Sequence, residues 1–138
     1  MALSKIDADG VTGLQETLTA TTTVPSEGGA VTTNLAQGLA KSWVNFNGTG
    51  TIAARDSLNH ASLVDGGTGQ YTDTYSNPMT DTNYVAINLT SDGPNNFGPC
   101  GETEAVTTSS VQFDARYQGN NTPYDQQFCL VVIFGDLA

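Results

Sequence analysis

Basic residues are scarce in this chain of 138 residues. Four Lys or Arg stand against 14 Asp or Glu, which gives a formal net charge of -10 at pH 7. A nucleic-acid binder needs clustered cations that displace counterions from phosphates, and an anionic membrane surface attracts basic segments in the same way. The composition therefore excludes nucleic acid and membrane surfaces as main partners.

Cysteine and histidine are also rare, with only Cys100, Cys129 and His60 present. A secreted disulfide scaffold carries more cysteines, and a zinc site needs four ligands, or three and a water. We therefore expect no cofactor and no metal site. The sequence leaves open whether Cys100 and Cys129 remain thiols or form a bridge, and whether Asp7 and Asp9, before Gly10, hold a cation.

Long hydrophobic runs are absent. No stretch approaches the roughly 20 apolar residues that span a membrane, and the first seven residues lack the apolar run of a signal peptide. We therefore expect a soluble protein that is synthesised in the cytoplasm.

Small polar residues are abundant instead: Thr, Ser, Asn and Gly account for 55 of the 138 residues. Thr favours pleated strands, while Gly and Asn adopt the backbone angles of tight turns. This mixture predicts an all-β protein with many turns. Seven strands are expected, at residues 42–47, 51–58, 61–64, 70–75, 83–89, 111–117 and 128–134.

Aromatic residues are missing from the first 42 residues, and all eleven lie between Trp43 and Phe134. Aromatic side chains supply much of the burial in a small core, so the self-supporting core should begin near Trp43. We expect residues 1–42 to form an extended N-terminal arm and residues 43–138 to form an antiparallel β-sandwich. Within the arm, Asn34 and Gln37 have the spacing of a helix N-cap.

The run Phe128–Phe134 contains seven apolar residues without polar alternation. An antiparallel strand normally presents one polar face to solvent, so both faces of this strand should be covered. A second subunit is the simplest cover, with Cys129, Val131 and Ile133 as the expected interface residues. The alternative is a central strand over which a helix or loop of the same chain folds.

Catalytic patterns are weak. Asp114 and Glu102 are the only candidates for the pair of carboxylates that a glycosidase needs, and His60 is the only possible imidazole base for a hydrolytic triad. None of these three residues lies in a recognisable catalytic motif. We therefore expect a protein that is not an enzyme.

The stretch from Leu39 to Thr51, which contains Trp43-Val44-Asn45-Phe46-Asn47-Gly48-Thr49-Gly50, resembles a module of tail-fibre and other virion proteins of bacteriophages, especially marine and cyanobacterial phages. The segments 52–59, 65–71, 79–84 and 132–136 continue the resemblance, which covers about residues 38–138. Residues 3–6 also resemble short virion-attachment segments.

The resemblance implies a β-sandwich virion protein, often trimeric, whose N-terminal part attaches to the particle. We expect a homotrimeric, jelly-roll-like knob of the tail-fibre type, located in the virion. Leu3, Ile6, Val11 and Leu14 are the expected attachment residues.

Three other functions remain open. A capsid decoration or head-fibre protein is the main alternative, because a fibre usually has a long shaft and this sequence contains none. A glycan-degrading enzyme and an unrelated β-sandwich binding module are minor alternatives. In a fibre, Phe97, Tyr117 and Tyr124 lie in or near Asn-rich loops and are the expected contacts to a host surface glycan, although the same rings could pack their own loops.

Overall fold

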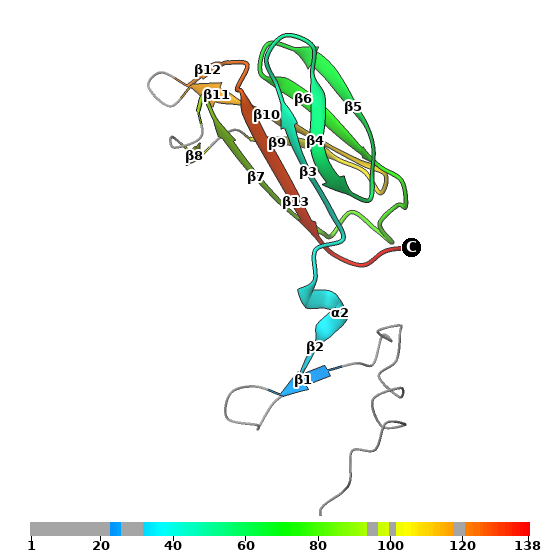
Figure 1. Cartoon of the computed structure of the whole chain (residues 1–138). Helices are drawn as coiled ribbons and strands as arrows, with labels where there is room; N and C mark the ends of the chain where they lie inside the picture. The colour runs from blue at the N-terminus through cyan, green and yellow to red at the C-terminus, as the bar shows by residue number, and fades with distance from the viewer. Residues whose placement is uncertain (1–22, 26–31, 94–96, 100–101, 118–120) are drawn as a thin grey trace, which may run out of the picture. The chain divides into compact units, whose positions relative to one another are not determined.

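A computed structural model describes residues 23–25, 32–93, 97–99, 102–117 and 121–138 of the chain. Nearly all of its regular structure is antiparallel β-strand, with one short helix (Figure 1). The prediction of an all-β, antiparallel protein is confirmed. Backbone contacts group the chain into two compact units, Met1–Leu39 and Ala40–Ala138.

The described part of the first unit contains three short elements. Strand β1 (Thr23–Pro25) pairs antiparallel with β2 (Thr32–Asn34), and helix α2 (Leu35–Gly38) follows. The backbone N–H of Gln37 donates to the Asn34 side-chain oxygen at 3.3 Å, so Asn34 is the helix N-cap, as predicted. The expected attachment residues Leu3, Ile6, Val11 and Leu14 lie outside the described residues.

The second unit contains two main sheets. The larger one has five strands in the order β4 (Ala53–Leu58), β3 (Ser42–Asn47), β13 (Phe128–Phe134), β7 (Val85–Ser91) and β8 (Phe97–Pro99). The smaller one has four strands in the order β5 (His60–Gly67), β6 (Gln70–Tyr75), β10 (Ser110–Asp114) and β9 (Thr103–Val106).

Successive strands alternate between these sheets in pairs. The β3–β4 and β7–β8 pairs belong to the five-stranded sheet, and the β5–β6 and β9–β10 pairs belong to the four-stranded sheet. A separate two-stranded ribbon, β11 (Arg116–Tyr117) with β12 (Thr122–Pro123), lies between β10 and β13 in sequence. Strand β13 then enters the five-stranded sheet between β3 and β7.

One hydrophobic core joins the inner faces of the two sheets. The Phe46 ring of the larger sheet lies 5.1 Å from the Tyr71 ring and 6.0 Å from the Phe113 ring of the smaller one, with both contacts edge-to-face. Such aromatic contacts stabilise a core beyond their burial. The other buried apolar residues are Val44, Tyr75, Met79, Val111, Ala115, Cys129, Val131 and Ile133.

The chain passes from β4 to β5 through Asn59, which adopts a left-handed backbone conformation with φ 54°. Its side-chain oxygen accepts from the Asn77 backbone N–H at 2.7 Å, and its amide nitrogen donates to the Asn77 carbonyl at 3.0 Å. Asn tolerates this conformation better than most residues. Asn59 therefore fixes the corner at which the chain changes sheets.

The predicted strands at residues 42–47, 70–75 and 128–134 coincide with β3, β6 and β13. Two predictions were wrong. The strand expected at 111–117 is interrupted at Ala115, whose N–H and carbonyl bond to Gly69 and Tyr124 outside the main ladder. Strands β8 and β9 were not expected, because their residues resemble a polar loop.

We predict that Asn59→Ala lowers the free energy of unfolding by about 2–3 kcal/mol, because it strains the backbone and removes the side-chain bonds to Asn77. Asn59→Gly, which relieves the strain but also loses the bonds, should cost about half as much. Urea denaturation of both variants measures the difference. Equal stability of Asn59→Ala and the unchanged protein would contradict this role.

Candidate functional site

The outer face of the five-stranded sheet is mainly apolar, although the register with Trp43 and Leu58 places Asn45 and Asp56 on this face as well. In β13, Cys129, Val131 and Ile133 point into the core, so the residues between them point outward. Neighbouring strands add further apolar side chains in register, because Val132 lies opposite both Trp43 and Ile87. We call this surface the apolar face. It consists of Trp43, Leu58, Val85, Ile87, Leu89, Phe128, Leu130, Val132 and Phe134.

Several side chains of the apolar face are strongly exposed. The exposed fraction is 58% for Val85, 46% for Ile87 and 47% for Leu58, whereas Trp43 and Val132 are half-buried. Contiguous apolar surface of this kind usually marks an interaction site.

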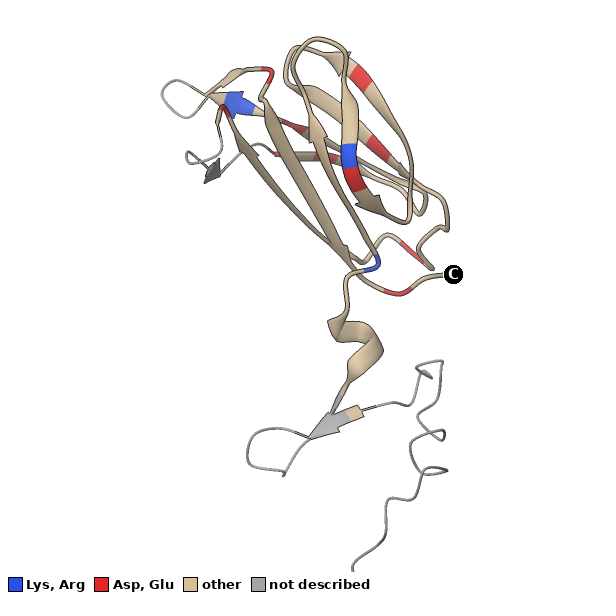
Figure 2. Cartoon of the chain, in the orientation of Figure 1, with Lys and Arg blue, Asp and Glu red and all other residues tan. Residues whose placement is uncertain are grey.

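Charge is nearly absent from the same sheet. Strands β3, β7 and β13 contain no charged residue (Figure 2), although the sequence contains 14 acidic residues. The flanking strand β4 contributes Arg55 and Asp56. The Arg55 guanidinium stacks over the Phe128 ring, 4.4 Å from its centroid, and donates to the Phe46 and Gln127 carbonyls, both at 2.6 Å. The Arg55 guanidinium is therefore already bonded to groups of its own chain.

The expected interface residues lie on the inner side of the same strand. Cys129, Val131 and Ile133 are at most 1% exposed and belong to the chain's own core. Because side chains alternate along a strand, their apolar neighbours face outward instead. This placement moves the expected interface from the odd-numbered to the even-numbered residues of β13. The Cys129 thiol donates to the Gln126 carbonyl at 3.6 Å, while Cys100 lies outside the described residues.

Two of the three aromatic residues expected to bind a glycan come together on the ribbon. The Tyr117 and Tyr124 rings lie 6.1 Å apart, tilted by 60°, and are 50% and 43% exposed. Phe97 begins β8, where only the backbone is described. We call Tyr117 and Tyr124 the tyrosine pair.

The two carboxylates considered for catalysis share one cation. Arg116 Nη2 lies 2.8 Å from the Asp114 carboxylate and 3.9 Å from that of Glu102, with Glu104 at 3.8 Å. Glu102 is largely exposed and Asp114 is nearly buried. A glycosidase pair must flank the scissile bond of a substrate, whereas these two acids flank the Arg116 guanidinium.

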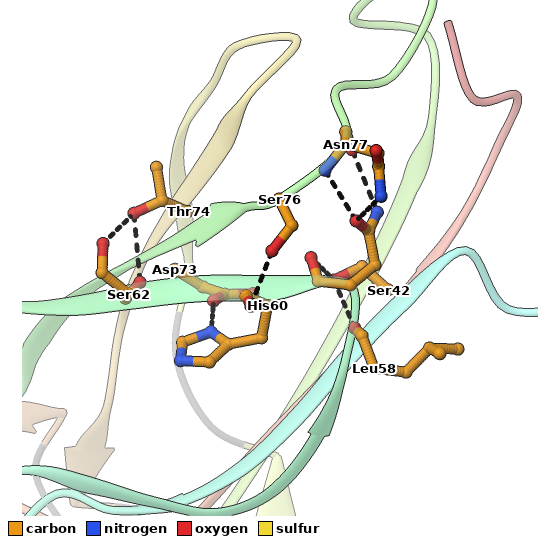
Figure 3. A network of polar contacts seen from close by, with 9 residues as sticks. Ser42, Leu58, His60, Ser62, Asp73, Thr74, Ser76 and Asn77 are labelled. Atoms are coloured by element: carbon orange, nitrogen blue, oxygen red, sulfur yellow. Dashed lines mark hydrogen bonds and ion pairs between the residues drawn. The ribbon is translucent and has the colours of Figure 1, made fainter.

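His60 pairs with an acid that the sequence analysis did not single out. Its Nδ1 lies 2.6 Å from the Asp73 Oδ1 atom, and the Asp73 side chain is fully buried on β6 (Figure 3). The neighbouring strands place Leu63 and Val111 opposite Asp73, so its surroundings are mainly apolar. The second oxygen, Oδ2, accepts no hydrogen bond from the described residues.

Burial raises the pKa of Asp73 from 3.8 to about 6, although the hydrogen bond from His60 and its charge act in the opposite direction. Burial likewise raises the pKa of the nearby phenols of Tyr75 and Tyr84, so both stay neutral. The Tyr75 hydroxyl donates to that of Tyr84 at 3.2 Å.

The polar groups around His60 do not complete a catalytic triad. Ser76 Oγ donates to the His60 carbonyl at 2.9 Å, and Ser62 Oγ lies 2.7 Å from Thr74 Oγ1, so neither hydroxyl bonds to the imidazole (Figure 3). A nucleophile must lie within hydrogen-bond reach of its base. Among the described side chains, none bonds to His60 Nε2. Within the described residues, the His60 imidazole therefore bonds to a buried carboxylate and not to a nucleophile.

Within the described ranges, no three His, Cys, Asp or Glu side chains are placed to hold a metal ion. The same part of the chain has no helix whose length and hydropathy would allow it to cross a bilayer. Comparisons with protein-family models, with curated proteins and with solved structures found no match.

We predict that the Asp73 carboxyl makes stability fall as the pH rises from about 4 to about 6. The native state holds this proton with a raised pKa, so in this range it binds more protons than the unfolded state does, and the free energy of unfolding decreases. The loss should reach about 2–3 kcal/mol. Below about pH 4 both states are protonated and the effect ends.

Urea denaturation at several pH values tests this prediction with Asp73→Asn, which keeps a polar group next to His60 and removes the titration. Between pH 4 and 6, the free energy of unfolding of Asp73→Asn should rise by about 2–3 kcal/mol relative to that of the unchanged protein. The control is Asp136→Asn, which makes the same substitution at an exposed position outside the core and should not reproduce this gain. Parallel profiles for Asp73→Asn and the unchanged protein would refute the assignment.

Proposed function

We propose that this chain is a non-enzymatic structural protein of a bacteriophage particle: a homotrimeric β-sandwich knob of the tail-fibre type, held on the particle by its N-terminal arm. The observation that carries the proposal is the apolar face, whose central strands β3, β7 and β13 contain no charged residue on a strongly acidic chain. An obligate interface has this character, because it resembles a core divided between subunits.

A second copy of the chain is the occupant that the charges favour. Each copy carries a net charge of -10, so association through most of its surface would bring like charges together. The central strands of the apolar face contain no charged residue, so copies can meet there without this repulsion. Trp43 supplies an aromatic side chain of the kind that often anchors an interface.

The opposite sheet has a polar outer surface, which suits exposure to water. Its outward residues include Ser62, Thr72, Thr74 and Gln112, which lie opposite one another in the β5–β6–β10 ladder. We propose that the apolar faces turn toward the threefold axis and that the four-stranded sheets face solvent. The resemblance of residues 38–138 to virion modules that are often trimeric supports three copies rather than two. The facing sheets with their common core support the β-sandwich, jelly-roll-like architecture.

The arm, residues 1–42, is proposed to attach the knob to the virion. Its lack of aromatic residues supports dependence on another surface for burial. Attachment to the capsid as a decoration or head-fibre protein is the alternative to the tail. The Arg116 guanidinium, which lies between the carboxylates of Asp114 and Glu102, weighs against the minor alternative, a glycan-degrading enzyme.

We predict that Ile87→Asp separates the trimer while each chain stays folded. An unpaired charge in a dry interface costs several kcal/mol, whereas Ile87 is 46% exposed in the single chain and does not support its core. Light scattering should show the mass falling from three times 14.4 kDa to that of one chain.

Val64→Asp is the matched control for this substitution. Val64 is 53% exposed on the outer surface of the four-stranded sheet, so the same type of change should leave the trimer intact. Circular dichroism of both variants checks folding. A trimer that survives Ile87→Asp, or an unchanged protein that is monomeric, would overturn the proposed interface.

We also predict that a chain lacking residues 1–39 forms the same trimer but no longer joins phage particles. The cut leaves intact the β3 start, where the Lys41 N–H donates to the Ile133 carbonyl at 2.8 Å. Incorporation of the shortened chain would refute attachment through the arm.

Antibody labelling of intact particles with the full chain distinguishes the positions: signal on the tail supports a fibre, and signal over the capsid supports decoration.

A further inference from the structure

The tyrosine pair lies at the β11–β12 ribbon, whose backbone is hydrogen-bonded to other segments of the described chain. In the β11–β12 ribbon, Tyr117 lies opposite Thr122, and the Tyr124 N–H donates to the Ala115 carbonyl at 3.0 Å. Residues that lie opposite one another in a ladder share a face. Both tyrosines therefore project from one face of the ribbon, with the Thr122 side chain on the same side.

The base of the ribbon is bonded to the core. The Ala115 N–H donates to the Gly69 carbonyl at 2.5 Å, and the Gly69 N–H donates to the Asp125 carboxylate at 2.7 Å. The same carboxylate accepts from the hydroxyl of the buried Tyr71 at 3.1 Å. A Cβ atom on Gly69 would lie 2.6 Å from the Tyr124 nitrogen, so only glycine allows this close approach. These bonds hold Tyr124 in place without a ligand.

On the other face of the ribbon, Arg116 forms an ion pair and a hydrogen bond. Arg116 alternates with Tyr117 and so points to the opposite side, where it pairs with Asp114 and donates to the Asn121 carbonyl at 3.4 Å. The acidic groups next to the ribbon are therefore engaged away from the tyrosine rings. Because these bonds hold the backbone that carries the two rings, little backbone entropy is lost when a ligand binds, which favours recognition.

We propose that the tyrosine pair binds a neutral carbohydrate, with the C–H face of a sugar ring on the aromatic rings and its hydroxyls toward Thr122 and the tyrosine hydroxyls. Pockets for small molecules combine apolar surface with a few polar groups in this way. Two rings are too small an area for a standard protein interface, which needs about 800 Å² from each partner. The net charge of -10 disfavours anionic sugars.

This inference goes beyond the proposed assembly and does not depend on it, because one chain contains the whole tyrosine pair. In a trimer the three pairs would act together, and a multivalent surface glycan would then bind more strongly by avidity.

Saturation-transfer NMR on the full chain tests the proposal, with cellotetraose, maltotetraose, galactobiose and triacetylchitotriose as neutral probes and sialyllactose as the anionic probe. At least one neutral probe should receive magnetisation at ring C–H protons. Tyr117→Ala and Tyr124→Ala should each weaken that binding about tenfold, while Tyr117→Phe, which keeps the ring and loses one hydroxyl, should weaken it less than Tyr117→Ala does. The exposed Val106 on β9 supplies the control variant Val106→Ala, which should bind normally.

The proposal is overturned if none of the four neutral probes receives magnetisation, if the two alanine variants bind as well as the unchanged protein, or if sialyllactose binds better than every neutral probe. Light scattering on the same samples separates this result from the assembly proposal. A trimer that binds no neutral sugar refutes only the carbohydrate site, and a monomer that binds one refutes only the trimer.

Discussion

Strand β13 has apolar side chains on both faces, and most strands of the second unit either pack against one face or extend the other. Its inward residues, such as Val131, pack against the aromatic cluster of Phe46, Tyr71 and Phe113 that joins the two sheets. Its outward residues continue across β3 and β7 into the apolar face. The first set stabilises the single chain, while the second forms a surface that remains partly exposed on it. One strand thus links folding to the proposed assembly.

The parts of this fold that depend on simple alternation were predictable from sequence. The bounds of β3, β6 and β13 follow from runs of strand-forming residues that end at Gly, Asn or Pro. The direction in which each side chain points was not predictable for β13, because all seven of its residues are apolar and alternation then carries no signal. Only the partner strands decide that Val131 points inward and Val132 outward.

Asp73 shows a second limit of sequence reasoning. It lies between Thr72 and Thr74, as many exposed acids do, and only pairing with β5 and β10 places it in the core. The signal that could have indicated it is the alternation of Tyr71, Asp73 and Tyr75, where two aromatic residues of one face flank an acid. The tyrosine pair was predictable as exposed aromatic residues in loops, but its geometry depends on bonds from Asp125 and Ala115 to Gly69, which is distant in sequence.

The position of β13 in the sheet has a consequence for how the protein is made. This strand is synthesised after both of its neighbours, β3 and β7, yet it lies between them and provides their only connection within the five-stranded sheet. Ser42, for example, can form its ladder pair only after Ile133 has been synthesised. Contacts so distant in sequence slow folding, and until β13 emerges the edges of β3 and β7 stay unpaired. The sheet therefore closes late, and misassociation between nascent chains is a hazard that its acidic charge helps to limit.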